Sequence, residues 1–185
     1  MNITARLDED VVRQLLGELL PLTIVLDDED RERRIWIDRA RNVDFAASEG
    51  LHVEVGGQLH WKIAGVAVVL TIQSAQLLLT PAVVDDVDGA RLVFQPSLTR
   101  MDLKSIPGFV DSGITGIVNK RLEAEGDKLA WHFGRDLANQ FPLPKELIEV
   151  DRFTLAARTA IVEVQADAIV FTVSLAMSFL RNPEP

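Results

Sequence analysis

One stretch, residues 106–141, constrains the fold more than any other part of the chain. Its apolar residues recur every three or four positions, which is the period of a helix with one apolar stripe. They are Ile106, Val110, Ile114, Ile117, Val118, Leu122, Leu129, Ala130, Phe133, Leu137 and Phe141. Ser105 and Pro107 suit the start of a helix, and Pro142 stops it. A continuous helix here would be about 50 Å long, and Gly126 marks the place where it could bend or break.

Most of the remaining chain alternates apolar and polar residues with the period of two that is typical of strands. Strands are expected over Asn2–Leu7, Leu22–Leu26, Ile35–Phe45, Leu51–Val55, Gln58–Ile63, Val66–Leu79 and Ala90–Leu103, with two more between Glu149 and Phe179. A short helix is expected over Asp8–Leu20, where three consecutive acids favour a helix N-terminus. A long helix among many strands needs a curved sheet to cover its apolar stripe. The sequence therefore predicts an α+β fold in which a strongly curved antiparallel meander sheet wraps a long amphipathic helix, with a short N-terminal helix beside it.

Three places interrupt the strand pattern. The alternation loses its phase around Ala40, which predicts a bulge. The pair Gly56-Gly57 allows either a tight turn or a bulge. Residues 81–89 begin with a proline and are rich in Asp, so we expect a turn there.

Length and charge bound the class of protein. The 185 residues suit one domain, which we place over 1–185. A formal net charge of −9 argues against a nucleic-acid ligand, because proteins that bind nucleic acids carry a positive footprint. Residues 1–10 lack the apolar segment of a signal peptide, so the chain as written is expected in the cytoplasm. A periplasmic protein or a lipoprotein whose leader has been removed would look the same.

Catalytic and metal-binding signatures are missing from the sequence, which also contains no Cys. His52 and His60 could meet across a hairpin at Gly56-Gly57 and form a metal or acid–base site with Glu54. Two histidines on the solvent side of strands is the simpler interpretation. The acidic run Asp27–Asp30 lacks the glycine and the distal glutamate of a calcium loop. We therefore expect no enzymatic activity, no cofactor and no metal.

Basic residues gather in one segment of this acidic chain: Arg31, Arg33, Arg34, Arg39 and Arg41, with Trp36 among them. A tryptophan beside arginines can make transient contact with the headgroups of a membrane. The arginines can equally pair with the neighbouring acids. We favour that second interpretation because exposed ion pairs are ordinary features of protein surfaces.

The order of elements over residues 77–122 resembles that of a known superfamily. A strand reaches a proline turn at Leu77-Leu78-Leu79-Thr80-Pro81, Leu92-Val93-Phe94 alternates, and Met101-Asp102-Leu103 precedes Ile106-Pro107-Gly108-Phe109-Val110. The helix then carries Ile117-Val118-Asn119 and Leu122. This order resembles the tubular lipid-binding (TULIP) superfamily, and is similar to its bactericidal/permeability-increasing-protein-like and small bacterial lipid-binding members. The resemblance implies a lipid or another apolar ligand and a role in lipid transport; it assigns no individual residue a role.

The leading hypothesis is non-enzymatic binding of a lipid or another long apolar molecule, in a tunnel between the long helix and the curled sheet. The expected lining residues are Phe109, Val110, Ile114, Ile117, Val118, Leu122 and Phe133 on the helix, and Trp61, Val68, Leu70, Leu92, Phe94 and Phe171 on the sheet. The alternative is a structural or protein-interaction module of the same fold. Its core would be filled, and its exposed face would contact a partner or form a homodimer. A cavity of roughly 300 Å³ or more would favour the binder.

Overall fold

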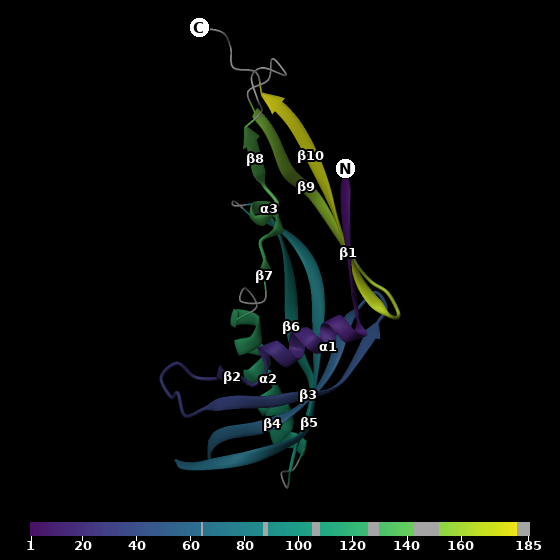
Figure 1. Cartoon of the computed structure of the whole chain (residues 1–185). Helices are drawn as coiled ribbons and strands as arrows, with labels where there is room; N and C mark the ends of the chain where they lie inside the picture. Colours follow the sequence, from purple (N-terminus) through teal and green to yellow (C-terminus); the bar gives the residue numbers. More distant parts are fainter. Residues whose placement is uncertain (64, 87–88, 105–107, 126–129, 143–151, 181–185) are drawn as a thin grey trace.

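The computed structural model describes the whole chain except residues 64, 87–88, 105–107, 126–129, 143–151 and 181–185. The described part contains two antiparallel sheets and three helices (Figure 1). In chain order the elements are β1 (Asn2–Asp8), α1 (Glu9–Leu19), β2 (Leu22–Val25), β3 (Arg34–Ala46), β4 (Gly50–Ile63), β5 (Val66–Asp86), β6 (Gly89–Leu103), α2 (Gly108–Glu125), β7 (Ala130–Trp131), α3 (Phe133–Asp136), β8 (Asn139–Pro142), β9 (Arg152–Val164) and β10 (Ala168–Leu180).

The larger sheet has the strand order β2-β3-β4-β5-β6-β7, and the smaller one has the order β1-β10-β9-β8. Every strand pairing is antiparallel. In Figure 1 the strands β3 and β4 run across the view while β5 and β6 turn upwards, so the larger sheet is strongly curled. The predicted α+β class with a curved antiparallel sheet is confirmed.

Helix α1 forms where the sequence predicts it. The Asp8 side chain accepts a hydrogen bond from the backbone N–H of Val11 at 3.0 Å and so caps the helix start. Glu9 and Asp10 place negative charge in the first turn, where the helix dipole favours it. Pro21 follows the C-terminal end and prevents continuation. The helix therefore leaves β1 and crosses the curled sheet beside β3 (Figure 1).

The long helix predicted over residues 106–141 is wrong beyond Glu125. Helix α2 ends there, and after residues 126–129 the chain forms β7, α3 and β8 instead. Two features explain the difference. Gly126 falls on the apolar stripe and has a low preference for helix. The apolar residues after it also serve a different core, because Phe133 packs with Leu92 and Phe171 rather than with the α2 stripe.

The interruptions in the strand pattern have three different outcomes. The bulge near Ala40 is confirmed, since the register of β3 against β4 shifts between Ala40 and Asn42. The glycine pair is a bulge within one continuous strand, β4, and not a turn. The turn predicted over 81–89 is wrong at its start, because β5 continues through Pro81 to Asp86. The β4–β5 register ends with Leu51 opposite Leu79, so beyond that point β5 pairs with β6 alone, and a proline without an N–H is tolerated.

Gly57 shows why the bulge in β4 requires glycine. A Cβ atom at this position would lie 2.0 Å from the carbonyl oxygen of Trp36 on β3. Any side chain would therefore push β3 and β4 apart. The bulge sharpens the twist of the sheet at this point, which helps to form its concave face.

Two clusters of buried side chains fill the described structure. The main core lies on the concave face of the larger sheet under α1 and α2, and its buried members include Val12, Ile35, Ile37, Val53, Leu59, Ile114, Val118 and Leu122. The second core joins β6, α3 and β10, and its buried members are Leu92, Phe133, Phe171, Val173 and Leu175. The chain thus packs one leucine- and valine-rich interior beside a smaller, aromatic one.

Candidate apolar binding site

A pocket of about 320 Å³ opens on the concave face of the larger sheet. Its floor comes from β3, β4, β5 and β6, and its walls come from α1, β2 and α2. The lining residues are Leu16, Leu19, Leu20, Leu22, Thr23, Ile24, Val25, Ile37, Val53, Val55, Leu77, Leu79, Pro96, Arg121 and Leu122. Thr23 and Arg121 alone among these are polar. The pocket is therefore a place where an apolar molecule would leave water.

The leucines of α1 lie in two neighbouring rows. Val12 is buried, and Leu16 and Leu20, one and two turns further along, pack partly buried against the main core. The second row, Val11, Leu15 and Leu19, is 37%, 44% and 56% exposed. One helix thus carries both a wall of the pocket and an apolar strip on its outside.

The pocket mouth lies at the edge of the sheet. Leu19 and Leu22 both line the pocket and are 56% and 44% exposed. Leu22 belongs to the edge strand β2 and pairs with Ile37, so its side chain lies on the same face as the buried Ile37. Exposed leucines next to a concavity mark an opening through which an apolar molecule could enter.

Helix α2 is fixed over the sheet by a side-chain amide. Asn119 donates from Nδ2 to the carbonyl oxygen of Leu98 at 3.0 Å, and its Oδ1 accepts from the N–H of the same residue at 2.6 Å. Strand β6 is irregular at this point, because the register with β5 skips Thr99. The amide therefore binds both backbone groups of Leu98 beside this irregularity, and it sets the position of Arg121 and Leu122 two and three residues later.

Arg121 makes a two-pronged ion pair at the pocket. Its Nη1 lies 3.1 Å from Oδ2 of Asp28, and its Nη2 lies 3.0 Å from Oδ1 of the same carboxylate. The Arg121 side chain is 24% exposed, whereas that of Asp28 is 77% exposed. This fork-to-carboxylate geometry is the strong form of an arginine ion pair. It connects the loop between β2 and β3 to α2.

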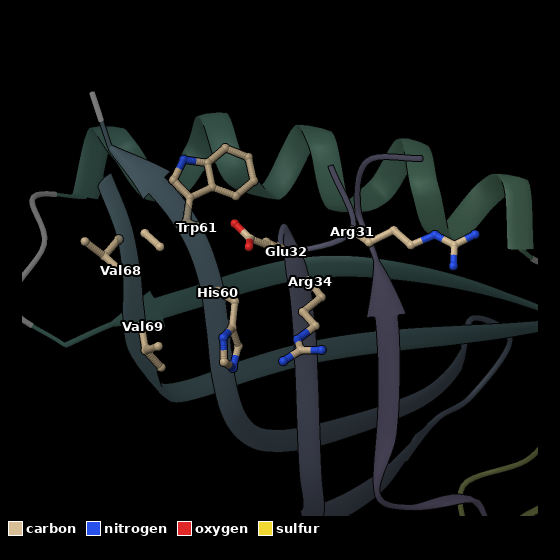
Figure 2. A pocket seen from close by; sticks show the side chains of 8 residues that line it. Arg31, Glu32, Arg34, His60, Trp61, Val68 and Val69 are labelled. Atoms are coloured by element: carbon tan, nitrogen blue, oxygen red, sulfur yellow. The ribbon is translucent and has the colours of Figure 1, made fainter. Parts of the chain in front are cut away.

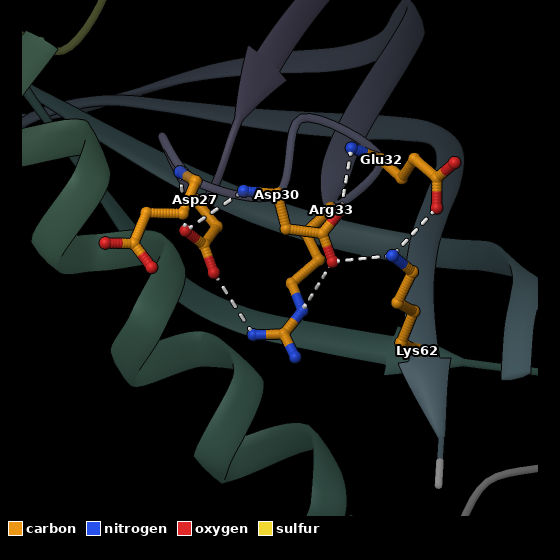
Figure 3. A network of polar contacts seen from close by, with 6 residues as sticks. Asp27, Asp30, Glu32, Arg33 and Lys62 are labelled. Atoms are coloured by element: carbon orange, nitrogen blue, oxygen red, sulfur yellow. Dashed lines mark hydrogen bonds and ion pairs between the residues drawn. The ribbon is translucent and has the colours of Figure 1, made fainter. Parts of the chain in front are cut away.

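The same loop is held by a network of its own, shown in Figure 3. Oδ1 of Asp27 accepts from the backbone N–H of Glu29 at 3.0 Å, and Arg33 reaches both Asp27 and Asp30 at 3.3 and 3.6 Å. Lys62 on β4 lies 2.9 Å from Asp30 and 2.9 Å from Glu32. The acidic run, which lacks the pattern of a calcium loop, is thus part of an ion-paired loop.

Protonation in this network is shifted by the contacts. The hydrogen bond from Lys62 lowers the pKa of Asp30 below its ordinary value, and the charges of Lys62 and Arg33 act in the same direction. Hydrogen bonds to Glu32 and then to Asp30 raise the pKa of Lys62. Each group is therefore held in its charged form over a wider pH range in the folded protein.

Most predicted lining residues lie in the cores and not at this pocket. Among the members of the predicted set whose side chains are described, Leu122 alone lines it. Ile114 and Val118 are buried in the main core, against which Trp61, Leu70 and Phe94 pack half-buried. Leu92, Phe133 and Phe171 are buried in the second core. Val68 is half-buried at a different hollow. Phe109 and Val110 lie outside the residues whose side chains the structure describes.

The burial predicted for Ile117 is wrong. The apolar stripe predicts a buried side chain, but Ile117 is 42% exposed. Ile114, Val118 and Leu122 are spaced by four residues and already cover the face of α2 that meets the sheet. Ile117 falls on the outer flank of that row.

Sequence reasoning missed the α1 wall of the pocket. Leu16, Leu19 and Leu20 lie in the short helix predicted over Asp8–Leu20, but none of them is among the predicted lining residues. The width of that stripe is the signal that could have identified them, because two adjacent rows of leucine are more than one packed face needs.

The disfavoured alternative of a histidine site finds no support in the strand arrangement. His52 and His60 lie eight positions apart on the single strand β4, so no hairpin brings them together. His52 lies 3.7 Å from Glu49, and His60 pairs in register with Arg34 and Val69. Among the described residues, no group of three or more His, Cys, Asp or Glu could hold a metal ion.

A second hollow, of about 460 Å³, lies at the end of the β4–β5 hairpin. In Figure 2 the side chains of Arg34, His60 and Val69 point to one side of the strands and Trp61 points to the other. Arg33 stacks over the Trp61 ring at 5.1 Å. The lining of this second hollow includes Arg31, Glu32 and Arg34, so the hollow is charged, whereas the first pocket is apolar.

The arginine cluster divides into paired and unpaired members. Arg33 pairs with Asp27 and Asp30, and Arg41 lies 4.0 Å from Glu54. Arg31, Arg34 and Arg39 have no ion pair with any residue that the structure describes. The expectation that the arginines pair with neighbouring acids therefore holds for only part of the cluster.

No model of a known protein family matches the chain, and no curated protein is similar to it in sequence. A solved structure described as "Crystal structure of lipopolysaccharide binding protein" is similar over 98% of this chain, with 11% identity and a TM-score of 0.36. The match covers 52% of that protein, so the chain spans about half its length. Because a TM-score of 0.36 does not establish a shared fold, function has to be inferred from the pocket. None of the helices in the described part of the chain is long and apolar enough to cross a membrane.

Proposed function

We propose that this protein binds a lipid or another long apolar molecule in the pocket between α1, α2 and the concave face of the larger sheet, and performs no chemistry on it. One observation carries the proposal: a pocket of about 320 Å³ whose described lining residues are apolar except for Thr23 and Arg121. That volume lies at the lower end of the range for ligand pockets, roughly 300–1,000 Å³.

The driving force would be the removal of hydrocarbon from water. Each methylene group gains about 0.8 kcal/mol on burial. A chain of about a dozen methylenes would keep several kcal/mol after the loss of translational freedom and internal rotation is subtracted. A dry pocket of leucine and valine supplies this energy without any specific polar contact. The resemblance of the sequence to the TULIP superfamily agrees with this proposal. We further propose that the pocket is part of a continuous tunnel and that the protein has a role in lipid transport.

The alternative, a filled structural module in one domain over 1–185, predicts a solid interior at the same place. The main core is solid beneath α2, where Ile114 and Val118 are 3% and 2% exposed. Beside α1 it is hollow, and the hollow opens past two exposed leucines. That opening favours the binder.

The test uses the neutral apolar dye 1-N-phenylnaphthylamine and its displacement by dodecan-1-ol. The wild-type protein is expected to bind the dye and to release it when the alcohol is added. Leu77→Trp places a larger side chain in the pocket and is expected to abolish dye binding. Leu78→Trp is the matched control, because the next residue of a strand points to the opposite face.

Both variants should keep the wild-type circular dichroism spectrum. A wild-type protein that binds neither the dye nor the alcohol would refute the proposal. If Leu77→Trp bound the dye with wild-type affinity, the dye site would have to lie outside this pocket.

Membrane contact through the arginine segment is a second candidate. The exposed side chain of Trp36 lies near Arg34 on β3, and Arg31, Arg34 and Arg39 have no ion pair with the described residues. Headgroups of anionic lipids would supply the missing negative charge. Flotation with vesicles of phosphatidylcholine and phosphatidylglycerol should carry the protein upwards at low salt, and Arg31→Gln/Arg34→Gln should reduce this. Equal flotation with pure phosphatidylcholine would exclude the charge-based contact.

A further inference from the structure

We propose that the ligand of the pocket carries an anionic head group, a carboxylate or a phosphate, and that Arg121 binds it in exchange for Asp28. This inference rests on the proposed function, since it names the class of molecule that the apolar pocket would take.

The position of Arg121 is the first reason. Arg121 is the charged residue among the described lining residues, which are otherwise apolar except for Thr23, and it directly precedes Leu122, which also lines the pocket. A molecule with its hydrocarbon chain along the leucines would bring its head group close to this guanidinium. Its side chain is 24% exposed, so the charge lies at the boundary between pocket and solvent and not in the bulk.

The contact with Asp28 is the second reason. The carboxylate of Asp28 meets both Nη atoms of Arg121, at 3.1 and 3.0 Å. A fatty-acid carboxylate has the same shape and charge as this side chain, and a phosphate monoester presents the same pair of oxygens. Asp28 therefore shows the geometry in which Arg121 receives an oxyanion.

The exchange itself requires little rearrangement. The side chain of Asp28 is 77% exposed, so it keeps most of its hydration in the ion pair and loses little when it returns to water. The loop that carries it is held separately by Asp27, Asp30, Arg33 and Lys62. Asp28 can consequently release Arg121 while the loop stays in place.

The overall charge of the protein opposes the binding of anions, so a preference for them must arise from a short-range contact. A net charge of −9 repels anions at long range. Selectivity for an anionic head group must therefore come from the short contact with Arg121. Added salt would weaken the long-range repulsion more than that contact, so raising the ionic strength should not abolish binding of an anionic amphiphile.

The experiment compares probes with one hydrocarbon chain and different head groups. Sodium dodecanoate, dodecyl phosphate and dodecan-1-ol are titrated against the wild-type protein below their micelle concentrations, with 1-N-phenylnaphthylamine as the displaced dye. Hydrogen bonds to charged groups are typically worth enough for about a ten-fold change in affinity or more. We expect both anions to bind about ten-fold more tightly than the alcohol.

Three variants locate the effect. Arg121→Gln should lose the preference for the anions, so that the two anions and dodecan-1-ol bind this variant with similar affinities. Asp28→Asn removes the competing carboxylate and should tighten dodecanoate binding by a few-fold. Arg6→Gln breaks an exposed ion pair of similar type with Asp167, at 2.6 Å in the smaller sheet, and should change neither affinity.

The outcomes separate the two proposals. If dodecan-1-ol binds and the anions bind no better, or if Arg121→Gln keeps the preference, the head-group inference is wrong while the apolar site stands. If none of the three probes binds, both fail. If Arg121→Gln does not fold, Asp28→Asn still decides, because an unchanged dodecanoate affinity in that variant overturns the exchange with Arg121.

Discussion

The two ends of the interior solve the same packing problem in opposite ways. At the aromatic end, Trp131, Phe133 and Phe171 meet with ring centroids 5.0 to 5.9 Å apart, and Phe133 is fully buried. At the pocket end, the leucines of α1 face the valines of β4 and the leucines of β5 across a space of about 320 Å³. Both regions are apolar, yet one is solid and the other is open.

The size of the side chains and the number of surfaces that meet explain the difference. Large flat rings interlock edge to face and fill space between two layers. At the pocket three surfaces converge, namely α1, α2 and the curled sheet, and branched side chains of moderate length do not reach its centre. Aromatic residues form only 6% of the chain. Three of them meet at the aromatic end, and none of those that the structure describes lines the pocket.

Removing the centre of the aromatic end should give the largest effect. Phe133→Ala creates a cavity in a fully packed cluster and is expected to cost about 3–5 kcal/mol of unfolding free energy. Urea unfolding monitored by circular dichroism measures it. At temperatures where the variant stays folded, dodecan-1-ol should bind as it does to the wild type. Loss of binding in the folded variant would show that the two ends are coupled.

The matching truncation at the pocket end should cost less. Leu122 is 6% exposed and already borders open space, so Leu122→Ala removes fewer contacts than a leucine in a solid core loses. We expect about 2 kcal/mol, the low end of the range for such changes, together with weaker ligand binding. A loss as large as that of Phe133→Ala would mean that the pocket end is as tightly packed as the aromatic end.

Acidic and alkaline pH should both lower the stability of the pocket end more than that of the aromatic end. The pKa of Asp30 is lowered in the folded protein, so its stabilising contribution is present above about 3.9 and is lost as pH falls through the folded value. The pKa of Lys62 is raised, so its contribution is present below about 10.4 and is lost as pH rises through the folded value. Both groups lie near the surface, and the effect should be modest.

Thermal melting across this pH range measures the effect in the wild type, in Lys62→Met and in Lys104→Met. Lys62→Met should flatten both flanks of the profile, whereas Lys104→Met should leave them unchanged because Lys104 has no ion pair with the described residues. A profile of Lys62→Met identical to that of the wild type would exclude the network as a support for the pocket wall.

The smallest effect is expected on the outside of α2. Ile117 is 42% exposed, so Ile117→Ala should change the unfolding free energy by no more than about 0.5 kcal/mol. Thermal unfolding checks this against Leu122→Ala, five residues further along the same helix. A cost near 2 kcal/mol would show that another surface covers Ile117 in solution.

The alternation of apolar and polar residues and the helix caps predicted the elements well where the local sequence determines the structure. Asp8 and Pro21 mark the first helix within a residue or two, and the hairpin of β9 and β10 follows from strict alternation. The pattern failed after Glu125, because a helical period shows which residues avoid water and does not show which core they join. Phe133 avoids water in α3 and a second core, not in a long helix.

The pocket could not be predicted for a related reason. Apolar patterns identify Leu16, Leu20 and Leu77 as buried, but an empty space depends on what their neighbours fail to fill. Ile117 and Leu122 illustrate the limit, since both fit the predicted stripe and only one of them faces the sheet. Arg121 belongs to no apolar pattern at all, and only the folded chain places it beside the leucines.

The pairing of β1 with β10 has a consequence for how the protein is made. Asn2 lies opposite Ser174, so the strand that leads into α1 finds its partner only after some 170 further residues have been synthesised. Translation proceeds at roughly 5–20 residues per second, so β1 waits on the order of ten seconds or more for that partner. During that time the N-terminal end of α1 lacks the anchor that the paired strand β1 gives it. The wall of the pocket is anchored at both of its ends only when β10 has paired with β1, so competence to bind should follow the folding of β10.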